Sequence, residues 1–162
     1  MPALTDYFAP GPAIMARLKP LSGLMAVEEL GVLADCLAGS PEEAARRLAT
    51  LAPRCPAVFV GFDRELPAPA YESGDQVVQQ RWLVVLAVRH AGGATTGREV
   101  QTAAGPILPR LIKSLSGWRP LPEVGPLFRI AAPAPAIVGG FGFFALAFSL
   151  TALFEGADFE EY

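Results

Sequence analysis

The chain has 162 residues, of which 52% are hydrophobic and only 18% are charged, and its formal net charge is −3. This length suits one domain with a buried core, spanning residues 1–162, and the charge lacks the strongly basic balance typical of nucleic-acid-binding domains. Cys36 and Cys55 have no metal-site spacing and indicate free thiols in a reducing compartment. So few charges predict apolar surface that partner subunits cover; a compact domain rich in Ala and Pro is the alternative.

The amino-terminal third is predicted to be built from short elements. Residues 1–12 contain three prolines and a glycine, and we expect an irregular arm. A short helix over 13–19, a short strand over 24–27 and one or two helical turns over 29–37 follow, separated by glycine and proline.

A clearer helix begins after Ser40. Ser40 can cap the helix, Pro41 suits its first position, and the acidic pair Glu42 and Glu43 complements the positive end of the helix dipole. Apolar side chains recur along one face up to Leu51, and prolines then end the helix.

The middle of the chain reads as a hairpin. The run AVFVGF at 57–62 predicts a short apolar strand, residues 63–75 a loop rich in proline and glycine, and residues 76–90 a long strand. Trp82 and the residues that alternate with it form one apolar face of the long strand. The opposite face is also apolar, which is typical of a central strand covered on both sides.

After a loop at 91–97, residues 98–115 show the apolar spacing of a helix. Pro106 and Pro109 interrupt this segment, so its first half is expected to be kinked or separate. A short strand is predicted over 127–131.

The uncharged stretch 131–154 is long enough for a membrane-spanning helix. From Phe144 onward, however, large apolar side chains alternate with small ones, which is the period of a strand. Pro133, Pro135 and a glycine-rich run disfavour a helix, and no cluster of Lys or Arg flanks the stretch. The sequence therefore predicts a buried strand over 137–154 and no membrane span.

Residues with catalytic or metal-binding patterns are not found. His90 is the single histidine, and no nucleophile motif accompanies it. The GGFG run at 139–142 opens a strand rather than a helix, so it is expected to mark a bulge or a close backbone contact instead of a phosphate site. We therefore expect no catalytic residues, no metal and no cofactor.

Four segments then follow in a particular order: PAVFVGF at 56–62, QRWLVVLAVRHA at 80–91, AGPILPRLIKSLSGWRP at 104–120 and GGFGFFALAFSLTALF at 139–154. In this order they resemble the tail-terminator-like proteins of Mu-like and other long-tailed phages. The matching motifs are hydrophobic and structural rather than chemical. The amino-terminal third agrees only in its strand-helix-helix plan.

The resemblance implies an α/β (α+β) fold, with a mixed, mainly antiparallel β-sheet and helices packed on one side. It implies a homo-oligomer, a hexameric ring, at the head-proximal end of the tail in the virion, after assembly in the bacterial host cytoplasm. Its partners would be the phage tail tube protein and the head–tail connector proteins. DNA would pass through the lumen without sequence-specific contacts, and the family offers no catalytic residues to transfer.

Charge is distributed unevenly along the chain. Between Arg81 and Arg129 seven basic residues accompany two acidic ones, whereas residues 155–162 form an acidic tail. These regions could meet across subunits of a ring, and ordinary solvated charge is the alternative. The candidate interface residues are Tyr7, Phe8, Arg64, Glu65, Tyr71, Arg119, Arg129, Glu155, Asp158, Phe159 and Tyr162.

Two other functions are compatible with the sequence. One is another head–tail connector or neck protein of similar fold. The other, from a different class, is a small-molecule-binding α/β domain or enzyme with Arg89 and His90 near a pocket.

Overall fold

A computed structural model describes residues 1–68, 74–90 and 97–156. Within them six strands form one sheet in the order β1-β2-β3-β6-β4, and β5 also pairs with β6. The strands are β1 (Ala26–Glu29), β2 (Ala57–Leu66), β3 (Gln76–Arg89), β4 (Phe128–Ile130), β5 (Ala136–Val138) and β6 (Phe141–Phe154). β1 and β2 are parallel and the other strand pairs are antiparallel. The mixed, mainly antiparallel sheet of the predicted α+β fold is thus confirmed.

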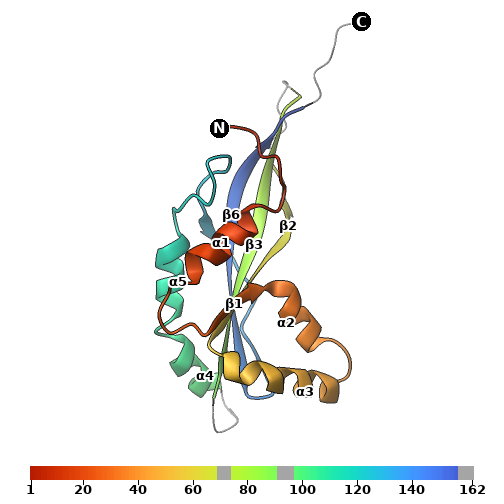
Figure 1. Cartoon of the computed structure of the whole chain (residues 1–162), viewed down its shortest axis with the longest axis vertical. Helices are drawn as coiled ribbons and strands as arrows, with labels where there is room; N and C mark the ends of the chain where they lie inside the picture. Colours follow the sequence, from red (N-terminus) through yellow and green to blue (C-terminus); the bar gives the residue numbers. More distant parts are fainter. Residues whose placement is uncertain (69–73, 91–96, 157–162) are drawn as a thin grey trace, which may run out of the picture.

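Helices cover both faces of this sheet (Figure 1). They are α1 (Pro10–Leu18), α2 (Leu30–Leu37), α3 (Pro41–Leu51), α4 (Gly97–Ala104) and α5 (Leu108–Leu115), and a single 3₁₀ turn, η1 (Ala52–Arg54), follows α3. α1, α4 and α5 pack on one face, and α2 and α3 pack on the other. The expectation that the helices lie on one side was wrong, because the central strand β3 is apolar on both faces and each face needs its own cover.

The two layers of helices form two hydrophobic cores. The larger core joins α1, α4 and α5 to alternate side chains of β3 and β6, among them Trp82 and Phe148. The smaller core joins α2 and α3 to Phe59 and Val85 on the opposite face. Large residues at 144, 146 and 148 lie in the first core, as their alternation predicts.

Helix α3 begins as its sequence predicts. The Ser40 side chain accepts a hydrogen bond from the Glu43 backbone N–H, and the Glu43 carboxylate accepts one from the Ser40 N–H. The segment after residue 97 is divided into α4 and α5, in agreement with the proline interruption. By contrast α1 begins already at Pro10, which suits the first turn of a helix, so the irregular arm is shorter than expected.

The strands at 26–29 and 128–130 differ from the predicted bounds by one or two residues, and the larger differences lie at β2 and β6. β2 continues to Leu66, beyond a bulge between Phe62 and Arg64, although residues 63–66 were expected in a loop. The strand predicted over 137–154 is a hairpin of β5 and β6, because Gly139 and Gly140 both have positive φ and form a tight turn. The charged residues at 63–65 favoured a loop over an extended β2, and the strand was predicted to run through Gly139 and Gly140, which instead form the turn.

The expected close backbone contact lies at Gly142. A Cβ atom there would be 2.7 Å from the Val100 Cβ, so α4 rests directly on the backbone of β6. Within the described ranges no helix is long and apolar enough to cross a membrane.

Candidate assembly surface

The amino-terminal arm packs on its own subunit. The Tyr7 ring stacks on Phe154 at 5.3 Å between centroids and meets Phe62 edge-on at 5.6 Å. The Tyr7 hydroxyl donates a hydrogen bond of 2.5 Å to Glu65 Oε1. Burial, together with this bond and the charge of Glu65, raises the pKa of Tyr7 to about 12. Leu4 is buried, so two arm side chains are used to complete the fold rather than left for a partner.

A buried glutamine connects the arm to the core. Gln80 is 0% exposed. Its Nε2 donates to the Tyr7 carbonyl at 2.8 Å, and its Oε1 accepts from Trp82 Nε1 at 3.0 Å. Sequence reasoning overlooked Gln80, although an uncharged polar residue within a long apolar strand is a signal for a buried hydrogen bond.

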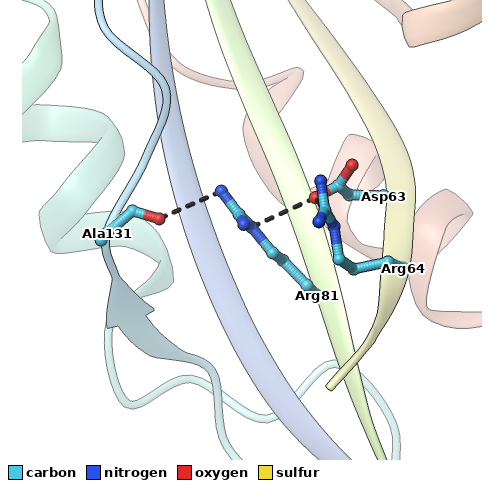
Figure 2. A network of polar contacts seen from close by, with 4 residues as sticks. All are labelled: Asp63, Arg64, Arg81 and Ala131. Atoms are coloured by element: carbon cyan, nitrogen blue, oxygen red, sulfur yellow. Dashed lines mark hydrogen bonds and ion pairs between the residues drawn. The ribbon is translucent and has the colours of Figure 1, made fainter. Parts of the chain in front are cut away.

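Charged side chains bridge β2 and β3, and Figure 2 shows this network. Arg81 Nε lies 3.2 Å from Asp63 Oδ2, and Arg64 Nε lies 3.0 Å from the same oxygen. Arg81 Nη2 also donates to the Ala131 carbonyl at 3.1 Å, which ties the chain after β4 to the sheet. Arg81 is largely covered while Arg64 is mostly exposed, so Arg64 is the member of the network that a partner could reach.

A groove runs along one edge of the sheet, between α1 and α2. It has a volume of about 560 Å³, and apolar residues of both helices and of β2 line it, including Met15, Leu30 and Phe62. β1 pairs only with residues 57–60 of β2. In the described part of the chain, the outer edge of β2 from Gly61 to Leu66 therefore has no strand partner.

The predicted interface residues fall into two groups. Tyr7, Phe8 and Glu65 lie together beside β2, where Phe8 remains 56% exposed. Arg129 is exposed on β4, at the opposite edge of the sheet. Arg119 is also exposed. It lies close to β4, because the carbonyl of the adjacent Trp118 accepts a hydrogen bond from the backbone N–H of Leu127, the residue before β4.

The end of the chain is described only in part. Glu155 is exposed just after β6. Tyr71, Asp158, Phe159 and Tyr162 lie outside the described residues, so their expected roles stay predictions.

The surroundings of Arg89 and His90 give little support for a small-molecule site. Arg89 lines a cavity of about 400 Å³ whose other lining residues are mainly Ala, Pro and Gly with Phe141, and His90 does not line it. Burial raises the pKa of the Cys55 thiol, which makes it less reactive as a nucleophile. Among the residues that the structure covers, no group of three or more His, Cys, Asp or Glu side chains could hold a metal ion.

Comparison with known proteins gives one family. The family described as "Phage tail terminator protein" matches residues 41–157, from α3 to just beyond β6. A search of curated proteins gives no match. Since the family match covers well over half of the 162 residues, the chain belongs to the phage tail terminator family and is a structural protein of a phage tail.

Proposed function

We propose that the chain forms a closed ring of six copies at the head-proximal end of the tail tube. The ring ends polymerisation of the tube protein and offers a surface to the head–tail connector. The family match over residues 41–157 carries this proposal. The low share of charged residues and the apolar side chains exposed at the sheet edges support it.

The proposed mechanism is assembly without catalysis. A ring closes when each copy uses one surface to bind a different surface of the next copy. One side of the ring copies the contact that a tube subunit would make, and the other side lacks that contact, so growth stops. On this proposal the chain is not an enzyme and needs no cofactor.

The proposal is tested at two levels. Size-exclusion chromatography with light scattering should give a hexamer of the 17.1 kDa chain. Electron microscopy of phage lysates made without this chain should show tails of uncontrolled length that are not joined to heads. Normal tails joined to heads in the absence of the chain would contradict the proposed function.

We also propose that the acidic tail, residues 155–162, lies near basic residues of the 81–129 region in a neighbouring copy. Deleting residues 155–162 is expected to weaken ring assembly while the melting temperature of the isolated chain changes little. If the shortened chain still forms rings and still gives tails of normal length, the acidic tail is only a solvated end.

A further inference from the structure

Large apolar side chains are exposed mainly at the two edges of the sheet. Phe8, Met25 and Val32 lie at the β1–β2 edge or on the helices next to it. Phe128, Ile137 and Val138 belong to β4 and β5, which both lie along the far side of β6. Phe128 is 61% exposed, which is unusual for a phenylalanine in a strand. Two apolar patches at opposite edges of one sheet suit contacts between copies that join head to tail.

The groove beside β2 has the shape of a socket at the first edge. Its floor includes Gly61 and Phe62, where the unpartnered part of β2 begins, and its walls are α1 and α2. Glycine and alanine leave room on the α2 wall: a Cβ atom added at Gly31 would have no atom within 4 Å, and Ala34 is exposed. A free strand edge with apolar walls on both sides is the arrangement that accepts an additional strand.

The opposite edge presents a strand that fits this socket. β4 runs antiparallel to β6, β6 to β3 and β3 to β2, so β4 runs antiparallel to β2. Placing β4 of one copy beside β2 of another therefore continues the antiparallel order of the sheet. Phe128 pairs in register with Ser149, so the two side chains share one face of the sheet. Phe148 and Leu150, on either side of Ser149, lie in the larger core, so Ser149 and Phe128 belong to the face that α2 and α3 cover. In a contact between copies, Phe128 would therefore meet the open α2 wall of the groove.

The charged residues that line the groove are opposite in sign to those exposed at the β4 edge, while the exposed Arg64 lies farther along β2, outside the groove lining. Asp6 and Glu29 line the groove, and Glu29 is exposed. At the β4 edge Arg119 and Arg129 are exposed, and Glu123 is the acidic residue nearest in sequence. Opposite charges at the rims of two surfaces speed their association and select their orientation.

We propose that the groove between α1 and α2 binds the β4 edge of a second copy of this chain, with Phe128 as the aromatic anchor. The contact extends the sheet from one copy into the next, and repetition around an axis closes the ring. This inference rests on the proposed function, because it names the surfaces by which the ring would form.

Two variants test the inference by changing one edge each. Phe128→Asp removes the anchor, and Gly31→Trp fills the groove; both sites are exposed, so the fold should persist by circular dichroism. Each variant alone is expected to be monomeric in light scattering, with subunit affinity reduced about 30-fold or more, as for removal of a central interface residue. Phe128→Tyr and Gly31→Ala are the matched controls and should still form rings.

Mixing the two variants gives the decisive measurement. Each retains the surface that the other has lost, so an equimolar mixture should form a one-to-one heterodimer of twice the 17.1 kDa chain mass but no ring. Rings formed by either variant alone, or a mixture that stays monomeric, would overturn this interface while ring formation by the unaltered chain stands. An unaltered chain that is monomeric at its highest soluble concentration would overturn both the ring and the interface.

Discussion

Replacing Trp82 tests the packing on which the sheet and arm depend. Trp82 is 3% exposed, and α1 rests so closely on its indole that a Cβ atom at Gly11 would lie 2.8 Å from it. Truncation of a buried tryptophan to alanine costs about 3–5 kcal/mol. Trp82→Ala also removes the donor to Gln80 Oε1, and a buried acceptor left without a partner costs about 1–3 kcal/mol. Because the cavity and the lost bond share one site and need not add, we expect a loss of about 4–6 kcal/mol.

The measurement is urea unfolding followed by far-ultraviolet circular dichroism, with Trp118 as a second, fluorescent reporter. Trp82→Phe is the matched control, since it retains most of the ring and loses only the donor and some volume; a loss of about 1–3 kcal/mol is expected. The Phe variant also keeps the test readable if the Ala variant does not fold, because a domain has only about 5–15 kcal/mol of stability. A loss below about 2 kcal/mol for Trp82→Ala, or equal losses for both variants, would refute the reasoning.

Three further changes have defined outcomes. Ser40→Ala should lower the unfolding free energy by about 1 kcal/mol by removing a helix cap, while Ser40→Asp, which can also cap, should not; urea titration that shows no difference between them would contradict the capping role. Tyr7 has a pKa of about 12 in the folded chain against an ordinary 10.0, so its contribution to stability is present below pH 10 and lost as the pH rises toward 12. Tyr7→Phe also loses the hydrogen bond to Glu65, and its melting temperature should fall less between pH 10 and 12 than that of the unaltered chain. Identical dependence of the melting temperature on pH in the two chains would contradict this role of Tyr7. Gly142→Ala should destabilise the chain by about 1–3 kcal/mol because its methyl group meets Val100, and an unchanged melting temperature would show that α4 can move away.

Most of the sheet could be predicted from the periodicity of its strands. The alternation in β3 and β6 is long enough to identify both central strands, and the α3 cap has a local sequence signature. The side on which the helices pack has no local signature, because it depends on contacts between distant segments. In the structure the apolar face of α3 covers the second apolar face of β3, and Leu48 and Val85 lie together in the smaller core.

The candidate surface could be predicted only in part. Aromatic residues in the arm suggested anchors, yet whether an anchor binds its own subunit or a neighbour depends on what lies beside it. Tyr7 is held by Phe154 and Glu65 of its own chain, whereas Phe8 next to it stays exposed. Phe128 gave no signal in the sequence, because a phenylalanine in a short strand is normally expected to be buried.

The position of β6 has a consequence for how the protein is made. β6 is the last of the six strands to leave the ribosome, yet β3, β4 and β5 all pair with it. The Leu4 backbone N–H donates to the Leu153 carbonyl at 2.8 Å, so a segment translated early docks only after β6 is in place. Folding therefore cannot be completed during most of translation, because the sheet forms only after β6 has been made. A polypeptide that ends before β6 therefore lacks the strand with which β3, β4 and β5 pair, and it cannot form this sheet.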